Sequence, residues 1–197
     1  MPILLLVVLG IVELGMLMRD HNVVVSNTRI GVRIASTGAG AGPGVCETGT
    51  GAPPCTPASA PALAQYAADA IQRSGSAMPV DQIQYILVYK ANADGYPGTD
   101  GNTTMPTGCA GYSNCVKFTW KASSNKFRYA EGSWNSTTIS ACFPGTVSKP
   151  LDRVGIEMVA SHKTFTGLFG SSIKLEDHAV GTFEPLDAQH CGAGTHP

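Results

Sequence analysis

Charged residues are scarce in this sequence. They make up 14% of its 197 residues, against about 25% in typical soluble domains. The 13 basic and 14 acidic residues give a net charge of −1, so the chain lacks the basic surface on which nucleic-acid binding depends. It also lacks a run of like charges that would suggest a polybasic membrane patch. We therefore expect no nucleic-acid partner.

The short motifs of hydrolases and metal sites are also missing. None of the five histidines belongs to an H-x-x-H or H-E-x-x-H pattern, and no Gly-x-Ser-x-Gly elbow occurs. Residues 92–95 and 100–102 are rich in Asn, Asp and Gly, but their spacing fails the EF-hand loop, which favours polar turns over a calcium site. We expect no enzyme, no cofactor and no metal, although residue types alone leave a Ser–His–Asp triad open.

The six cysteines all follow the apolar N-terminal stretch. An even number in a loop-rich chain with 23 Gly and 13 Pro favours three disulfides and an oxidising compartment. No Cys-x-x-Cys pair exists, and the spacings fit no zinc module. Fifteen pairings are possible, and we expect two short loops and one tie of the C-terminal tail to the body. The expected pairs are Cys46–Cys55, Cys109–Cys115 and Cys142–Cys191.

Residues 1–18 form an apolar run that contains one charge, Glu13. As a helix, the run would be roughly 27 Å long, close to the ~30 Å hydrocarbon core of a bilayer. A buried carboxylate in such a helix is functional by default. We expect Glu13 to set the register of assembly by pairing with an amine or an Arg of the next subunit. A Glu that merely reaches the interface is the alternative.

Three interpretations of the apolar run compete. A cleaved secretory signal needs a basic start and an A-x-A-like site, and no Lys or Arg precedes Arg19. A plain membrane anchor would place the arginines after the run in the cytoplasm, whereas the cysteines favour the outside. The conflict disappears if a basic leader has been removed, as in processed pilins.

The helix is predicted to continue to residue 35, for a length of roughly 50 Å. Helical spacing of apolar residues persists to Ile34, and residues 36–38 are helix breakers. Gly31 would allow another helix to approach closely. Arg29 and Arg33 lie one turn apart, on an expected solvated or subunit-facing surface. A globular body of this size cannot cover the whole helix, so half of it needs lipid or neighbouring copies.

The rest of the chain predicts an α+β domain. Residues 37–58 form a Gly/Pro-rich linker, Ser59 and Pro61 begin a second helix that Gly75 ends, and residues 59–197 form the globular domain. Alternating apolar residues then predict four or five strands of an antiparallel sheet. The last strand is expected to start at residue 173 and to break near Asp177. The second helix and the upper half of the first could cover one face of this sheet.

Two segments resemble a known family. Residues 9–15, Leu-Gly-Ile-Val-Glu-Leu-Gly, resemble the transmembrane motif of TadE-like proteins of Tad (type IVc) pilus systems, and Asn27 to Arg33 look like the continuation of that motif. Residues 154–158, 164–170 and 173–185 look like the closing hairpin of family members with a cysteine-bearing outer domain. The resemblance covers about 35 residues at each end. The family's processing Glu, upstream of a Leu-Pro step, has no counterpart here.

The resemblance implies a pilin-like fold: a long N-terminal helix, then a disulfide-stapled antiparallel sheet with one further helix. It implies a structural subunit of an extracellular type IV-like pilus that is inserted in the inner membrane before assembly. Its partners would be identical subunits and other pilus subunits. The assembly residues, for buried charge and close packing, would be Glu13, Gly10, Gly15, Arg29, Gly31 and Arg33.

Two other functions remain possible at this stage. One is a membrane-tethered extracellular binding domain, and the other is a minor pseudopilin that assists assembly without being the main subunit. A tethered hydrolase ranks below both. Asn102 and Asn135 begin Asn-x-Thr sequences that fit glycosylation acceptors, a pattern that is common by chance.

Overall fold

The computed structural model describes residues 2–44, 60–74, 78–142, 150–167, 170–187 and 191. The expected pair Cys46–Cys55 and most of the linker over 37–58 lie outside the described residues, as do Ser59 and Gly75, so those predictions are not addressed.

A single long helix begins the fold. Helix α1 spans Pro2–Ser36, which confirms the predicted extent of 3–35 to within one residue at each end. The helix stops where the Ser36 hydroxyl donates to the Arg33 carbonyl (2.9 Å) and the Gly38 N–H donates to the Ala35 carbonyl (3.0 Å). The side chain of Ser36 thus competes for the last carbonyls of the helix, as expected of a breaker.

A second, shorter helix lies beside the first. Helix α2 spans Ala62–Ser74 and begins directly after Pro61. Its buried face is rich in alanine, from Ala64 and Ala67 to Ile71, so α1 and α2 can pack closely. Three one-turn 3₁₀ helices complete the helical elements of the described residues: η1 (Ala39–Ala41), η2 (Val80–Gln82) and η3 (Ser136–Thr138).

Five strands form one antiparallel sheet in the order β3-β2-β1-β4-β5. This confirms the predicted fold class of a long helix, an antiparallel sheet and one further helix. The last strand is unbroken, however: Met158 pairs with Asp177 in the middle of the β4–β5 ladder. The predicted break was wrong because the Asp177 side chain has a partner on α1, described below. The strands are β1 (Ile83–Ala91), β2 (Cys115–Lys121), β3 (Lys126–Ser133), β4 (Arg153–Lys163) and β5 (Ser172–Thr182).

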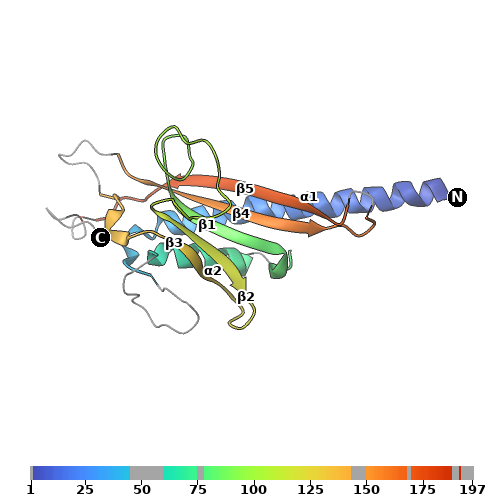
Figure 1. Cartoon of the computed structure of the whole chain (residues 1–197), viewed down its shortest axis with the longest axis horizontal. Coiled ribbons are helices and arrows are strands. Elements are labelled where there is room, and N and C mark those ends of the chain that lie inside the picture. Colours follow the sequence, from blue (N-terminus) through green and yellow to red (C-terminus); the bar gives the residue numbers. More distant parts are fainter. Residues whose placement is uncertain are drawn as a thin grey trace.

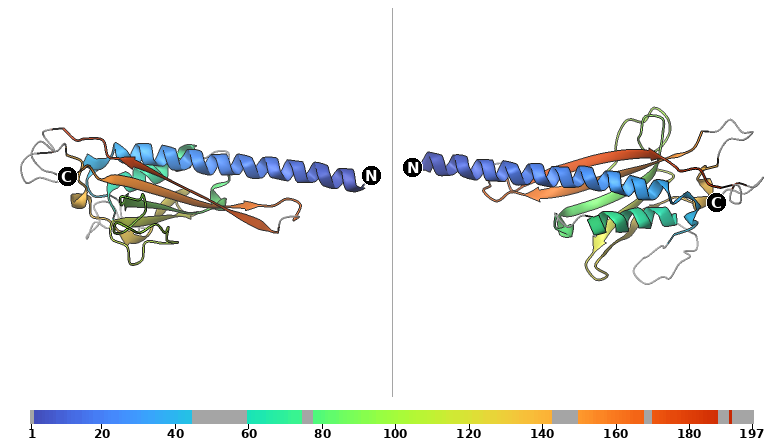
Figure 2. Two further views of the ribbon diagram at one scale, coloured as in Figure 1. Left: turned by 90° about the horizontal axis from the view of Figure 1, so that it is seen from above. Right: turned by 180° about the vertical axis from the view of Figure 1, so that it is seen from behind.

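The two helices cover one face of the sheet, and the chain between β1 and β2 covers part of the other (Figures 1 and 2). Alternate residues of β4 separate the faces: Ile156 and Met158 belong to the helix-covered core, and Val159 to the opposite cluster. The N-terminal part of α1 extends beyond the sheet.

Two glycines permit close approaches that a larger residue would prevent. A Cβ on Gly31 would lie 2.8 Å from Ile156 Cδ1 and 2.9 Å from Ile71 Cδ1, so α1 rests directly on both α2 and β4 here. A Cβ on Gly155 would overlap the ring of Tyr89 on the opposite face of the sheet. Gly31 therefore serves packing within the chain, against its own α2.

Two disulfides fasten the loops to the sheet. Cys109 is joined to Cys115, and Cys142 to Cys191; these are the same two pairs that the loop lengths suggested. The first closes the end of the β1–β2 connection, and the second ties the C-terminal segment to the chain before β4.

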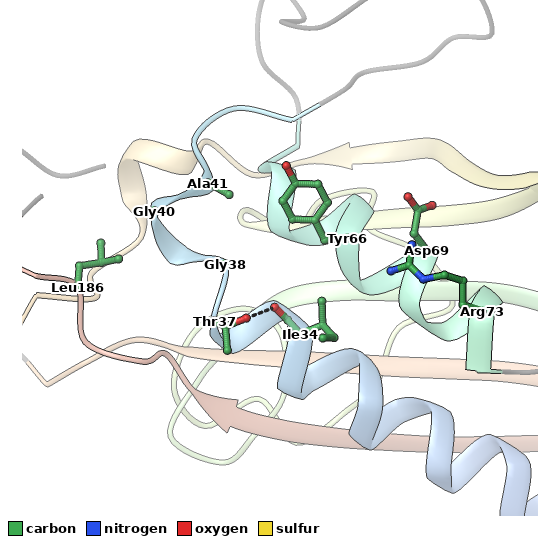
Figure 3. Close-up of a pocket in the computed structure, with 9 residues that line it drawn as sticks. All are labelled: Ile34, Thr37, Gly38, Gly40, Ala41, Tyr66, Asp69, Arg73 and Leu186. Carbon is green, nitrogen blue, oxygen red and sulfur yellow. Dashed lines mark hydrogen bonds between the residues drawn. The ribbon is translucent and has the colours of Figure 1, made fainter.

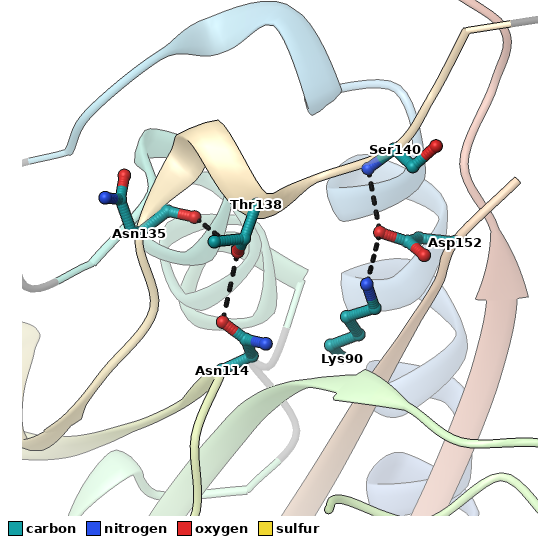
Figure 4. Close-up of polar contacts among 6 residues, drawn as sticks. All are labelled: Lys90, Asn114, Asn135, Thr138, Ser140 and Asp152. Atoms are coloured by element: carbon teal, nitrogen blue, oxygen red, sulfur yellow. Dashed lines mark hydrogen bonds and ion pairs between the residues drawn. The ribbon is translucent and has the colours of Figure 1, made fainter. Parts of the chain in front are cut away.

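A polar cluster organises the segment near Cys142 (Figure 4). Asp152 accepts a hydrogen bond from the Ser140 N–H (2.7 Å) and forms an ion pair with Lys90 (2.6 Å). Thr138 is held between the Asn135 carbonyl (2.7 Å) and the Asn114 side chain (3.1 Å). These contacts fix η3 and the chain that leads to the Cys142–Cys191 bridge.

Within the described part of the chain, no helix is both long enough and apolar enough to cross a membrane. The membrane-spanning helix expected from residues 1–18 is thus not found among the described residues.

Candidate assembly interface

The N-terminal half of α1 is apolar and exposed. Over residues 3–18, ten large apolar side chains are at least half exposed, from 50% for Val8 and Val12 to 78% for Ile3. Six of them follow one another at residues 3–8. Consecutive residues of a helix are about 100° apart, so six of them encircle the axis. The apolar surface therefore surrounds the helix and is not a single stripe. The ten are Ile3, Leu4, Leu5, Leu6, Val7, Val8, Ile11, Val12, Leu14 and Met18.

Glu13 is the first buried residue of α1, with 2% of its surface exposed. One carboxylate oxygen accepts the Phe165 N–H (3.0 Å), and the other accepts the Thr166 N–H (2.9 Å) and the Thr166 hydroxyl. Phe165 and Thr166 lie in the loop between β4 and β5. The structure thus gives Glu13 partners in its own chain, and pairing with a cation of another subunit stays a separate prediction.

Further polar contacts join α1 to the sheet and to α2. Asp20 Oδ2 lies 2.7 Å from Nδ1 of the buried His162 on β4. Nearly two turns later, Asn27 accepts a hydrogen bond from the Ser74 hydroxyl at the end of α2 (3.0 Å). Thr28 donates to Asp177 on β5 (2.7 Å). Each contact fixes the position of α1 along its own axis relative to the sheet and α2.

The spacing of these anchors was present in the sequence but not recognised. Glu13, Asp20 and Asn27 are seven residues apart. Seven residues make nearly two turns of a helix, so the three side chains share one face. A polar residue every seventh position within an apolar helix was the signal that could have identified Asp20 as a partner site.

The glycines of the N-terminal segment differ from Gly31. A Cβ added to Gly10 or to Gly15 would meet no atom of the described chain within 4 Å. Both positions therefore leave the helix backbone open to an approaching neighbour, as small residues do at close helix–helix contacts.

Arg29 and Arg33 lie on the exposed side of α1. With Asn22, Ser26 and Ile30 they line a shallow hollow of about 410 Å³. This basic surface faces away from the sheet, on the same helix as the exposed apolar segment. The predicted solvated or subunit-facing location of the two arginines agrees with this position.

A larger hollow of about 770 Å³ lies at the C-terminal end of α1 (Figure 3). Tyr66, Asp69 and Arg73 of α2 line one side of it, and Ile34 of α1 and Thr37, which directly follows α1, line the other. Tyr66 is half exposed there. The hollow offers a second partly apolar surface, at the opposite end of α1 from Ile3.

The two predicted glycosylation acceptors have different surroundings. The Asn102 amide nitrogen donates to the carbonyls of Pro97 (2.6 Å) and Thr104 (3.1 Å), so a glycan on that nitrogen would disrupt the loop. Asn135 is exposed, and its side-chain oxygen caps η3 by accepting the Thr137 N–H (3.0 Å). Asn135 is the more accessible of the two.

The predicted polar turns at residues 92–102 are built around one side chain. The buried Asn92 amide donates to the carbonyls of Thr99 (2.8 Å) and Asn102 (2.9 Å). Its oxygen accepts the N–H groups of Asp94 (3.0 Å) and Tyr96 (2.9 Å). Across the ranges that the structure describes, no three His, Cys, Asp or Glu side chains gather where they could hold a metal ion.

No protein-family model, curated protein or solved structure matches this chain.

Proposed function

We propose that this chain is a structural subunit of an extracellular filament of the type IV-like (Tad) pilus kind, polymerising through α1. The observation that supports the proposal is the apolar surface that encircles residues 3–14 of α1. A dimer would cover one stripe of such a helix, whereas a helix that is apolar on all sides must be surrounded. Identical helices packed around a filament axis would surround it.

Burial of this segment supplies the driving force. A fully buried Leu, Ile or Val side chain contributes about 1.5–3 kcal/mol relative to an exposed one. The ten large apolar side chains are 50–78% exposed, so burying their exposed part contributes roughly 9–18 kcal/mol. This gain is comparable to the cost of fixing one subunit, which is about 4–15 kcal/mol. Gly10 and Gly15 would let neighbouring helices approach closely.

The anchors between α1 and the body keep the exposed segment in a fixed direction. Glu13, Asp20 and Thr28 each bond to β4, β5 or the loop between them. Because α1 is attached to the sheet at three positions along its length, it cannot change its angle to the sheet freely. Each subunit would therefore present its apolar segment with the same geometry, which regular polymerisation requires.

The proposal is tested by an apolar-to-charged substitution on the exposed segment. Ile11→Glu changes a side chain that is 65% exposed, so the fold should persist while packing of α1 against its copies is lost. The measurement is the amount of the chain in filaments sheared from producing cells. Lys126→Glu, an exposed change at the start of β3, is the matched control and should leave that amount unchanged. Wild-type filament yield from Ile11→Glu would refute the proposal.

A further inference from the structure

The face of the sheet opposite the helices carries a hollow that the proposed function does not use. It has a volume of about 420 Å³ and lies between strands β1, β4 and β5 and the chain that follows β1. Tyr85, Glu157 and His178 line it from the strands, and Tyr96 and Met105 from the β1–β2 connection. The ring centroids of Tyr96 and His178 are 5.2 Å apart, which closes one side of the hollow.

Glu157 is the feature that points to a ligand. It is 4% exposed, and its Oε2 atom has no hydrogen-bond partner although it is buried. Removing a carboxylate from water without a partner is costly. Burial, with a smaller effect of the nearby Glu176, raises the pKa of the Glu157 carboxyl to about 7, and Lys174 opposes this shift. A cation in the hollow would remove this cost.

Among the described residues, no lysine near the hollow forms a hydrogen bond or ion pair with this oxygen. Lys174 forms its ion pair with Glu176. Lys117 donates to the Thr107 carbonyl (2.9 Å) and lies 3.4 Å from Glu131. Its Nζ is 4.7 Å from the centroid of the Tyr85 ring, which shows that an ammonium group can lie against this tyrosine.

We infer that the hollow binds a primary alkylammonium group, with Glu157 as its counter-ion and the tyrosine rings against its alkyl chain. An ammonium has three donors and no acceptor, and the threonines that line the hollow supply further oxygens: Thr103, Thr104 and Thr107. Aromatic rings attract such a cation. A metal ion fits less well, because the described residues offer no cluster of three metal-ligating side chains and burial keeps the Tyr85 hydroxyl protonated by raising its pKa to about 12.

The rim of the hollow is fixed before any ligand binds. The β1–β2 connection is held by the Asn92 hydrogen bonds and by the Cys109–Cys115 disulfide. A preformed site loses little conformational entropy on binding. The inference does not depend on the filament proposal, because the hollow and the exposed segment of α1 lie on different parts of the chain.

The test is titration of the purified full-length chain with n-butylammonium and, in a separate arm, with N-acetyl-lysine N-methylamide, followed by amide chemical shifts. We expect saturable shifts around Tyr85, Glu157 and His178, with affinity that rises with pH through about 7. Glu157→Gln should weaken binding at least about tenfold, whereas Glu184→Gln, an exposed acid, should leave it unchanged. Binding of only the lysine compound would identify a peptide side chain as the ligand, and binding of only the amine a small molecule.

Two results would overturn the inference. One is the absence of saturable shifts with both ammonium compounds. The other is line broadening of the same amides by Mn²⁺ with no response to either ammonium, which would make the hollow a metal site. Since Glu157→Gln removes an unpaired buried charge, it should not unfold the chain, and its amide spectrum checks this directly.

Discussion

Glu13 and Thr166 are joined by hydrogen bonds, although they lie 153 residues apart in the sequence. The carboxylate on α1 accepts both the backbone N–H (2.9 Å) and the hydroxyl of Thr166. The residue that interrupts the apolar run thus holds the tip of the β4–β5 hairpin against α1. On the N-terminal side of Glu13, none of the described side chains of α1 is buried, so the bond marks where the body ends and the exposed segment begins.

Glu13→Gln should loosen the hairpin tip without unfolding the chain. A glutamine has one acceptor oxygen in place of two, so it cannot accept from both the Phe165 and the Thr166 N–H groups in the observed geometry. We expect faster hydrogen exchange of these two amides, with exchange in the centre of β4 unchanged. Arg29→Gln, an exposed change on the same helix, is the control. Unchanged exchange at both amides in Glu13→Gln would show that the bonds do not hold the loop.

Glu157 should make the stability of the chain fall as pH rises. Its pKa is raised to about 7 in the folded state from an ordinary value of 4.5, so between these values the folded chain binds more protons than the unfolded chain. Stability is then lost as pH rises through this window, by about 1–3 kcal/mol in total. The groups that face Glu157 are Tyr85, Tyr89, Tyr96, Lys174, Glu176 and His178.

The measurement is denaturant unfolding of Glu157→Gln and of wild type at pH 5 and pH 8. In wild type, the free energy of unfolding should be lower at pH 8 than at pH 5. In the variant most of this difference should be absent, so the variant should be the more stable protein at pH 8. A pH dependence that is the same in both proteins would mean that Glu157 is ionised in the folded chain throughout.

The two disulfides should differ in how much they contribute to the free energy of unfolding. The loop that Cys142–Cys191 closes spans 49 residues, against 6 for Cys109–Cys115. If cross-links act by restricting the unfolded chain, the longer loop stabilises by about 4 kcal/mol and the shorter by about 2. Paired Cys→Ala variants, each removing one bridge, allow unfolding free energies to be compared. A larger loss from removing Cys109–Cys115 would contradict the loop-length explanation.

Gly155→Ala should destabilise the chain more than Gly31→Ala. The added methyl group meets the rigid ring of Tyr89 at Gly155, whereas at Gly31 it meets the Cδ1 ends of two flexible isoleucines. Overpacking costs typically about 1–3 kcal/mol, and we expect Gly155→Ala near the upper value. Gly15→Ala is the control, because nothing lies within 4 Å of its added Cβ, and it should stabilise the helix by about 0.5–1 kcal/mol. Equal losses at Gly155 and Gly31 would show that the Tyr89 ring can move.

Much of the fold follows from local patterns in the sequence. Most elements are predicted correctly from three patterns: the apolar run, the breaker after residue 35 and the alternation in β1, β2 and β4. These patterns reflect which side of each element is buried. Asp177 was misjudged as a strand break because its partner, Thr28, lies 149 residues away. A charged residue can occupy the middle of a strand when its side chain has a hydrogen-bond partner elsewhere in the fold.

The contacts of the site were harder to predict than the elements. Glu13 was identified as important, but Phe165 and Thr166 could not be named as its partners, because only the folded hairpin brings them to α1. Glu157 was passed over as one residue of an apolar strand. An acid between Ile156 and Met158 was the available signal, yet the sequence does not tell whether such a side chain is paired.

The most direct test of the central claim is electron microscopy of material sheared from the surface of producing cells, with mass spectrometry of its subunits. We predict filaments composed mainly of this chain, with α1 packed along the filament axis. If the chain is found only as single particles attached to membranes, or only in traces within filaments of another protein, the claim that it is the main subunit is contradicted, and the tethered binding domain or the minor pseudopilin becomes the better description.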